Sequence, residues 1–357
     1  MLYKLEMPVR KNYAGRRDIA AERRIGGNMA KAVYFNIDDN LDYENALLKE
    51  WGITDLKLVE IKDREGKKSF VEYLQEEKAD GLVVEYEKVT KEVMNQLPDL
   101  KIVSLQSIGY NNVDAAAATE HGICLTNVPG FCAEEVAVHA VGFAIDLVRK
   151  ISFYDRSVRA GKWDPLIGYK TCRMTGMNFG LVFFGEIPKK MVPVLKALGL
   201  NIIVYAPTKT KEYIAGFGCE KADTLEELLQ CSDFVSLHTP LKPETTHMIS
   251  EPQLRLMKKS AFLINTARGA VVDEPALVKA LREGWIKGAG IDVIEDETNE
   301  KSELFGLENV VITPHAAFIS EDSFFDARRR SLKQLVMRLS QKTVPEHLVN
   351  KDVRIKF

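Results

Sequence analysis

Short apolar runs alternate with longer helical stretches from residue 32 onward. Runs that are rich in β-branched residues and bounded by turn residues are typical of buried strands. The first five such runs are Ala32–Ile37, Leu56–Ile61, Gly81–Tyr86, Lys101–Gln106 and Ile123–Asn127. Because helical stretches separate them, the pattern predicts βαβ units that build one parallel sheet covered by helices.

A proline–glycine turn at residues 127–130 stops the fifth strand. Residues 134–150 then form one amphipathic pattern, which predicts a helix that is shared between domains or packs on a second subunit. The alternation restarts with six further predicted strands: Asn178–Phe184, Asn201–Ala206, Phe234–His238, Phe262–Asn265, Gly288–Val293 and Val310–Thr313. The sequence thus predicts an α/β fold with two doubly wound parallel sheets, the second with the strand count of a dinucleotide-binding fold. A last helix, about Glu321–Leu339, can return to the first domain and make it discontinuous.

Composition narrows the class of protein. A length of 357 residues suggests roughly two domains, and the net charge of −2 leaves no basic excess for nucleic acid. No apolar run reaches the roughly 20 residues of a spanning helix, so no membrane partner is expected. The five cysteines are dispersed and the six histidines form no ligand pattern, which predicts a cytoplasmic protein without a metal site.

Residues 1–28 are interpreted as an N-terminal extension, because the first predicted strand begins just after Met29. They are either a disordered arm or residues that precede the true start at Met29. Ile25–Asn28 can be encoded by bases that resemble a bacterial ribosome-binding site. The intact mass of the native protein tests this hypothesis.

Residues able to do chemistry follow three strands of the second predicted sheet: Arg268, Asp292 and His315. Carboxyl ends of parallel strands border the ligand crevice, so these side chains are expected to converge. An arginine there can clamp a carboxylate with two hydrogen bonds. The alternative is a surface arginine paired with Asp273 or Glu274, and a lone histidine is more often structural than catalytic.

This set of groups suits the reduction of a 2-keto acid. An imidazole can give a proton to the carbonyl oxygen near neutral pH. A carboxylate on its other ring nitrogen fixes the tautomer, and a cation holds the substrate carboxylate. A nicotinamide supplies the hydride, so the protein mainly orients the partners.

The blocks NTARG, IDVIEDE and TPH, in this order, resemble the signature of the D-isomer-specific 2-hydroxyacid dehydrogenases. The resemblance implies that Arg268 binds and polarises the substrate and that His315 is the acid/base. It further implies that Glu297 tunes the histidine and that Asp292 holds the nicotinamide carboxamide.

The choice of the tuning acid leaves alternatives. Family members usually have proline after this glutamate, whereas Thr298 follows Glu297 here. Glu295 and Asp296 are near enough in the sequence to take the same role.

The resemblance extends over residues 31–345. Residues 107–114 resemble the substrate loop, whose amides around Ile108 and Gly109 would hold the carboxylate. Residues 127–140 resemble the hinge segment and residues 238–249 the adenosine side of the cofactor site. The implied cofactor-binding residues are His238, Thr239 and Pro240 in the last of these segments and Thr266 in the NTARG block.

The resemblance also implies a domain plan. A Rossmann NAD(P)-binding domain, residues 131–319, would be inserted in a flavodoxin-like substrate domain made of residues 29–130 and 320–357. The implied partners are a small 2-keto or 2-hydroxy acid and a second copy of the chain in a homodimer. Phosphoglycerate dehydrogenases and C-terminal-binding-protein corepressors are among the relatives of this type.

The glycine fingerprint of the dinucleotide site departs from the family pattern. G-x-G-x-x-G should follow the strand, but the chain has Phe183, Gly185 and Pro188 at the three glycine positions. Gly185 keeps the close approach to pyrophosphate, and the amides of Glu186 and Ile187 remain available. The ring of Phe183 is bulky where the turn should be open. Pro188 falls in the first helical turn, where proline is tolerated, although its ring can force the helix away.

The acid that usually grips the adenosine ribose is also absent, since Ala206 stands in its place. Without it a 2′-phosphate is not repelled, and Thr208 and Lys209 can contact one, which favours NADP over NAD. The alternative is a solvated loop in a protein that binds cofactor poorly. Two functions therefore remain open at this point: an NAD(P)-dependent dehydrogenase, and a non-catalytic homologue that acts as a binding or regulatory protein.

Overall fold

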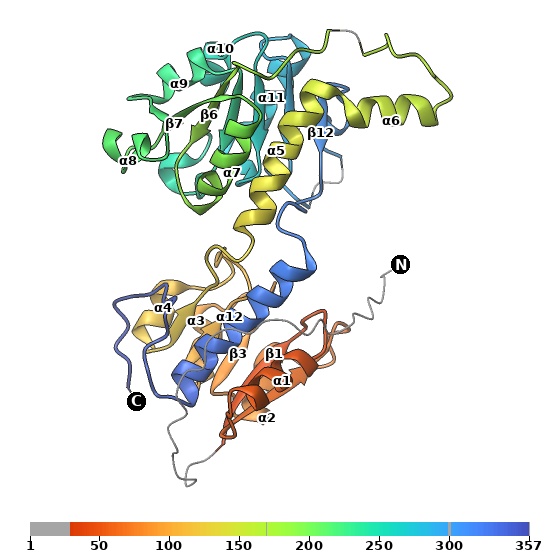
Figure 1. The fold of residues 1–357 in the computed structure, drawn as a ribbon. Helices are drawn as coiled ribbons and strands as arrows, with labels where there is room; N and C mark the ends of the chain where they lie inside the picture. Colours follow the sequence, from red (N-terminus) through yellow and green to blue (C-terminus); the bar gives the residue numbers. More distant parts are fainter. Residues whose placement is uncertain (1–28, 169, 299–300, 357) are drawn as a thin grey trace. The chain divides into compact units, whose positions relative to one another are not determined.

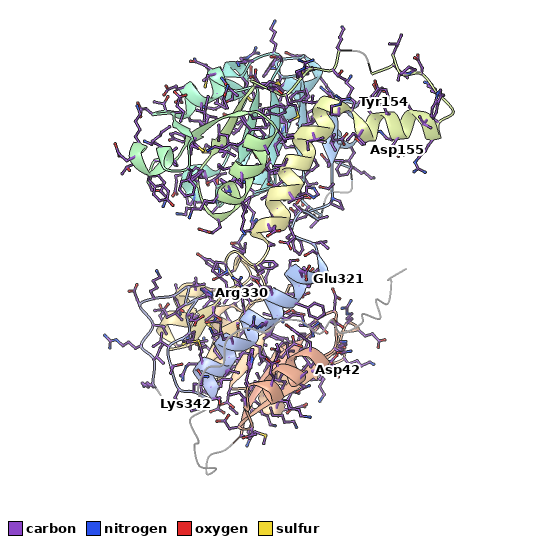
Figure 2. The ribbon with its side chains drawn as sticks, in the orientation of Figure 1. Asp42, Tyr154, Asp155, Glu321, Arg330 and Lys342 are labelled. Carbon is purple, nitrogen blue, oxygen red and sulfur yellow. The ribbon has the colours of Figure 1, made fainter. Side chains whose placement is uncertain are left out.

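The computed structural model describes residues 29–168, 170–298 and 301–356, so the interpretation of residues 1–28 lies outside the described residues. The chain divides into two compact units (Figure 1). One runs to Val128 and resumes at Arg328, and the other spans Pro129–Ala327. Side chains fill the space between the sheet and the helices within each unit (Figure 2).

The first unit contains a five-stranded parallel sheet in the order β2-β1-β3-β4-β5. This is the strand order of flavodoxin-like folds. The strands are β1 (Ala30–Phe35), β2 (Leu56–Ile61), β3 (Gly81–Val83), β4 (Ile102–Ser104) and β5 (Cys124–Thr126). Its helices are α1 (Asp42–Glu50), α2 (Phe70–Glu77), α3 (Lys91–Asn95), α4 (Ala115–Glu120) and the part of α12 (Glu321–Leu339) from Arg328 onward.

Helices cover both faces of this sheet. One apolar core lies under α2, α3 and α4, and the other lies under α1 and α12. A buried ion pair holds α12 to α1: the Arg328 guanidinium donates to both carboxylate oxygens of Glu44 at 2.8 and 2.6 Å. Glu44 is fully buried, so breaking this pair would leave an uncompensated charge and cost several kcal/mol, on the order of 3–5.

The second unit contains a seven-stranded parallel sheet in the order β12-β11-β10-β9-β6-β7-β8. Outward from β6 this is the dinucleotide-binding order, with the switch point between β6 and β9. The strands are β6 (Asn178–Val182), β7 (Asn201–Tyr205), β8 (Glu220–Lys221), β9 (Phe234–Leu237), β10 (Phe262–Asn265), β11 (Gly288–Ile291) and β12 (Val310–Ile312). Its helices are α5 (Ala133–Arg149), α6 (Ile151–Arg159), α7 (Glu186–Ala197), α8 (Lys211–Ala215), α9 (Leu225–Cys231), α10 (Glu251–Leu256) and α11 (Glu274–Arg282).

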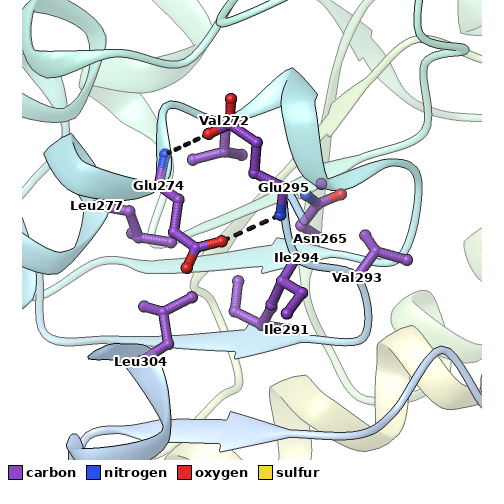
Figure 3. Close-up of a pocket in the computed structure, with 10 residues that line it drawn as sticks. Asn265, Val272, Glu274, Leu277, Ile291, Val293, Ile294, Glu295 and Leu304 are labelled. Carbon is purple, nitrogen blue, oxygen red and sulfur yellow. Dashed lines mark hydrogen bonds between the residues drawn. The ribbon is translucent and has the colours of Figure 1, made fainter. Parts of the chain in front are cut away.

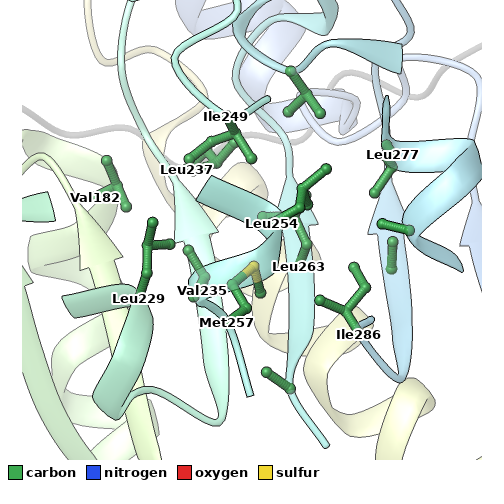
Figure 4. Packing of buried hydrophobic residues seen from close by; sticks show 14 of the residues in the cluster. Val182, Leu229, Val235, Leu237, Ile249, Leu254, Met257, Leu263, Leu277 and Ile286 are labelled. Carbon is green, nitrogen blue, oxygen red and sulfur yellow. The ribbon is translucent and has the colours of Figure 1, made fainter. Parts of the chain in front are cut away.

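Two apolar cores sandwich this second sheet. Figure 4 shows the one under α9, α10 and α11, in which Val235, Leu254 and Leu263 interdigitate. The other contains α5 and α7. Gly290 permits the close packing of α5, since a Cβ there would lie 2.7 Å from Cβ of Phe143.

The sequence predicted this architecture, and two sheets of doubly wound α/β type are confirmed. Some details were wrong. The edge strand β8 was missed, because two residues give no periodic signal. The predicted strands at Gly81–Tyr86 and Asn178–Phe184 were too long, since buried residues such as Val84 and Phe184 continue past the end of hydrogen bonding. The predicted helix 134–150 is α5, which lies in the core of the second unit.

Candidate active site

His315 follows β12 and is held in an uncommon backbone conformation. Its φ is 52°, in the left-handed region, and its amide donates to the carbonyl oxygen of Asp292 at 2.7 Å. Non-glycine residues in this region often mark functional sites, where the surrounding structure holds the strain. The Nδ1 atom of His315 lies 2.9 Å from Oε2 of Glu297, so the imidazole has a carboxylate on one ring nitrogen.

The other two acids of this loop have different partners. Glu295 accepts from Nε2 of His247 at 2.8 Å. Asp296 accepts from the hydroxyl and amide of Thr298, which lowers the pKa of Asp296. Of the three acids that the sequence left open, the geometry brings Glu297 to His315, and its catalytic role stays a prediction.

Asp292 fixes the turn that presents the histidine. One of its carboxylate oxygens accepts from the hydroxyl of Thr313 at 2.5 Å and from the amide of Ala316 at 2.8 Å. The other accepts from the amide of Ala317 at 3.1 Å. Sequence reasoning placed Asp292 at the nicotinamide, which stays a prediction, but it missed this structural role.

His139 on α5 is a further residue that sequence reasoning missed. Its Nε2 lies 3.0 Å from the hydroxyl oxygen of Thr313. Because that hydroxyl donates to Asp292, the Nε2 of His139 must carry the proton and donate to Thr313. The residue lies in the segment that resembles a hinge, and no spacing signal in the sequence connects it to residue 313.

Arg268 follows β10 and forms no ion pair with an acid among the residues that the structure describes. Asp273 caps α11 instead, accepting from the amide of Ala276 at 3.0 Å. Glu274 accepts from the amide of Glu295 at 3.0 Å. The surface ion pair considered as the alternative for Arg268 is therefore not formed. One guanidinium nitrogen donates to the carbonyl oxygen of Ala267 at 2.6 Å, and the other donors remain for a substrate carboxylate.

The loop of Arg268 and the loop of Glu297 are locked together. A Cβ on Gly269 would lie 1.7 Å from the carbonyl oxygen of Ile294, so this contact requires glycine. Beside it, Glu274 and Glu295 exchange hydrogen bonds, each carboxylate accepting from the other residue's amide (Figure 3). The positions of the candidate cation and the candidate acid are thus fixed by one set of contacts.

Phe183 takes the place of the first fingerprint glycine and adopts a glycine-like backbone. Its φ is 71°, and its amide donates to the carbonyl oxygen of Tyr205 at 2.7 Å. The ring is half-buried, lies edge-on to Tyr205 and packs against the core under α9. A left-handed residue with a Cβ costs roughly 1–2 kcal/mol, so the turn is kept at the expense of strain.

Pro188 is tolerated in the first turn of α7, which is one of the two outcomes that the sequence left open. α7 begins at Glu186 with Gly185 as its N-cap, and Pro188 is the buried third residue. Amides of the first turn have no partner within the helix, so a proline there removes no helical hydrogen bond. A Cβ on Gly185 would meet nothing within 4 Å, which leaves room for a phosphate in front of the amides of Glu186 and Ile187.

Two buried polar atoms at neighbouring strand ends have no hydrogen-bond partner among the described residues: Nδ1 of His238 after β9 and the hydroxyl of Thr266 after β10. Burial lowers the pKa of His238 to about 3, so its ring is neutral, and Nε2 lies 2.9 Å from the Ser236 hydroxyl. Unpaired buried polar groups are costly, and a ligand in the crevice would satisfy these two. The residues therefore fit a dinucleotide.

The other candidate cofactor-binding residues differ in whether their polar groups already have a hydrogen-bond partner. Thr239 donates to the carbonyl oxygen of Pro240 at 3.1 Å, so its hydroxyl is already used. Lys209 donates its amide to Ala206 at 3.1 Å in a turn that leaves Thr208 exposed.

The candidate substrate loop lies in the first unit, after β4. The carbonyl oxygens of Ile108 and Gly109 accept from Asn127 and Ser107 at 2.8 and 2.7 Å. Neither amide of the two residues donates to another described residue. Both amides are therefore available to a carboxylate.

A small apolar cluster joins the cofactor crevice to the histidine turn within the second unit. Cys132 and Val136 at the start of α5 pack with Ala317, and Ile187 of α7 packs against them. Phe318 belongs to the same cluster, and its ring lies edge-on to His315 at 5.8 Å between centroids. The first turn of α7 and the loop of His315 are thus neighbours.

Fold and crevice together define an α/β dehydrogenase with a dinucleotide site at the switch point of its second sheet. A protein-family model, described as "D-isomer specific 2-hydroxyacid dehydrogenase, NAD binding domain", matches residues 141–317. The chain is 41% identical to glyoxylate reductase of Thermococcus litoralis over 280 residues, which cover 75% of this chain and 82% of the relative.

Solved structures agree with this match. An NAD complex of a D-isomer specific 2-hydroxyacid dehydrogenase from Lactobacillus delbrueckii ssp. bulgaricus has a TM-score of 0.75 at 26% identity, covering 90% of this chain and 100% of that one. An acyclic imino acid reductase in complex with NADPH and D-Arg has a TM-score of 0.76 at 25% identity, covering 89% and 99%.

The chain belongs to the family of D-isomer specific 2-hydroxyacid dehydrogenases. The predicted class, an oxidoreductase that transfers a hydride between NAD(P)H and a 2-keto or 2-hydroxy acid, is confirmed. Within the described residues no helix is long and apolar enough to cross a membrane, and no group of three or more potential metal ligands occurs.

Proposed function

We propose that the protein reduces a small 2-keto acid such as glyoxylate, with Arg268, Glu297 and His315 at the reacting centre. The observation that carries the proposal is the 2.9 Å contact of His315 with Glu297 beside a crevice with unpaired buried polar atoms. The similarity to glyoxylate reductases, 41% identical in Thermococcus litoralis, supports the substrate class.

The roles follow from the contacts of each side chain. The guanidinium of Arg268 binds the substrate carboxylate and polarises the keto group. His315 donates a proton from Nε2 to the keto oxygen, because Glu297 holds Nδ1 as a donor and stabilises the imidazolium. The dinucleotide, which Gly185, His238 and Thr266 would help to hold, would supply the hydride from its nicotinamide.

Arg268→Gln tests the role of the cation. We expect kcat/KM for glyoxylate to fall by roughly 10²–10³, because a preorganised donor to the developing oxyanion is removed. Cofactor affinity, measured by nucleotide fluorescence, should not change. Arg282→Gln is the matched control, since Arg282 is an exposed arginine paired with Glu303 at 2.7 Å. Equal loss of activity in both variants would contradict the proposal.

We further propose a cytoplasmic homodimer that forms through α6 and the segment after it. α6 buries none of its residues, and large apolar side chains are exposed around it. They are Ile151, Val158, Trp163, Leu166 and Ile167. Such a patch is typical of a protein interface, and a second copy of the chain is the partner that the family suggests.

Trp163→Asp tests the dimer. The indole of Trp163 is 87% exposed, so a charge there should leave the fold intact and weaken an apolar interface. We expect a monomer in light scattering after size-exclusion chromatography, against a dimer of the unaltered protein. A monomeric unaltered protein would refute the homodimer.

A further inference from the structure

The carboxyl end of β7 carries no acidic side chain. Dinucleotide folds that select NAD use an Asp or Glu there to accept from the ribose 2′-hydroxyl. Here Ala206 is buried at 2% exposure, and the chain turns back on itself because the amide of Lys209 donates to the carbonyl oxygen of Ala206. Thr210 then caps α8 by accepting from the amide of Tyr213 at 3.2 Å.

Two lysines, one in the turn after β7 and one on α7, lie near Tyr213. The ammonium of Lys209 lies 5.2 Å from the ring centroid. Lys189 reaches the same tyrosine from the first turns of α7. Its hydrogen bond with Glu186, and to a lesser degree the nearby Tyr213 side chain, raises the pKa of Lys189. The ammonium of Lys189 is therefore charged at neutral pH.

The acid at the start of α7 is already paired with a lysine. Glu186, the first residue of α7, lies 2.7 Å from the ammonium of Lys189. Its charge is thus paired and does not oppose an anion at the end of β7. The local balance is positive in the place where the adenosine ribose of a dinucleotide lies in this fold.

We propose that Lys189, Lys209 and Tyr213 form a 2′-phosphate site and that the enzyme binds NADP(H) in preference to NAD(H). The inference rests on the proposed function, since it deepens the assignment of the same cofactor crevice. A phosphate dianion suits two ammonium donors, with the exposed hydroxyl of Thr208 as a further donor. NAD(H) gains nothing from these groups and finds no acid for its 2′-hydroxyl.

The test measures binding by isothermal titration calorimetry with NADPH, NADH, 2′,5′-ADP and 5′-AMP. The two fragments lack the nicotinamide, so they report the ribose site without turnover. We expect NADPH to bind at least tenfold more tightly than NADH, and 2′,5′-ADP more tightly than 5′-AMP. The difference should shrink at high salt, because it is electrostatic.

Two variants assign the difference to the lysines. Lys209→Gln and Lys189→Gln should each weaken NADPH about tenfold and leave NADH within twofold. Lys190→Gln is the matched control: it removes the same charge from the next residue of α7, whose ammonium faces Glu134 at 3.7 Å. It should change neither the affinity for NADPH nor the affinity for NADH. Thermal melts would check that all three variants fold.

The outcomes separate the inference from the proposed function. Equal affinity of the unaltered protein for NADPH and NADH overturns the 2′-phosphate site and leaves the dehydrogenase assignment intact. An equal loss of both cofactors in Lys209→Gln also overturns it. Failure to bind any of the dinucleotides, with the fold intact, overturns the proposed function itself.

Discussion

His315→Asn lowers the turnover of a 2-keto acid by roughly 10²–10⁴, the range that general acid catalysis contributes. Asparagine is chosen because His315 has a φ of 52°, and asparagine tolerates the left-handed region better than alanine. The backbone of the turn, held by Asp292, is therefore kept while the proton donor is removed. Steady-state kinetics give kcat, and nucleotide fluorescence should give an unchanged cofactor affinity.

His247→Asn is the control that makes this result specific. His247 also has a left-handed φ, of 50°, and also contacts a glutamate, Glu295 at 2.8 Å. Its side chain is 42% exposed, against 40% for His315. We expect at most a few-fold effect on kcat, so a similar loss in both variants would mean that the acid loop was disturbed. Unchanged turnover in His315→Asn would remove His315 from the mechanism.

The sequence was informative wherever a single residue type follows a strand. Arg268 and His315 could be named as candidates because parallel strands bring their carboxyl ends to one edge of the sheet. The alternation of short apolar runs with helical stretches also located both sheets, because a strand buried on both faces is a continuous run of apolar residues. These inferences need only local patterns and the topology of the fold.

The structural roles around those residues could not be read from the chain. Asp292 binds the backbone of residues 316 and 317, which lies 24 to 25 positions away. His139 reaches Thr313 across 174 positions. Such contacts depend on which strands lie side by side. Every residue except proline has a backbone amide, so the residue type of the partner does not reveal a hydrogen bond to its amide.

The altered fingerprint shows a different limit of sequence reasoning. The sequence left open whether Phe183 and Pro188 disturb the phosphate turn, because glycine is the usual residue at both positions. The chain nevertheless keeps φ at 71° for Phe183 and starts α7 at Glu186. The residue type predicts the free-energy cost of a backbone conformation, whereas the packing of the surrounding residues decides whether that conformation is adopted.

Gly269→Ala should have the largest effect on stability among the substitutions considered. The added Cβ would lie 1.7, 2.0 and 2.5 Å from the O and C atoms of Ile294 and the N atom of Glu295. All three are backbone atoms, so no side chain can rotate away and the loop of Glu297 must move. We expect a loss of about 3 kcal/mol in the free energy of unfolding, at the upper end for an overpacked core site.

Gly142→Ala separates this clash from the general effect of adding a methyl group. Gly142 lies inside α5, and a Cβ there meets nothing within 4 Å. The control should therefore gain roughly 0.5–1 kcal/mol, because alanine is the better helix former. Urea unfolding followed by far-UV circular dichroism measures both variants, and kcat/KM for glyoxylate measures the displacement of Glu297. If Gly269→Ala kept both full stability and full activity, the contact that joins the arginine loop to the acid loop would not exist, and the proposed fixed spacing of Arg268 and Glu297 would be wrong.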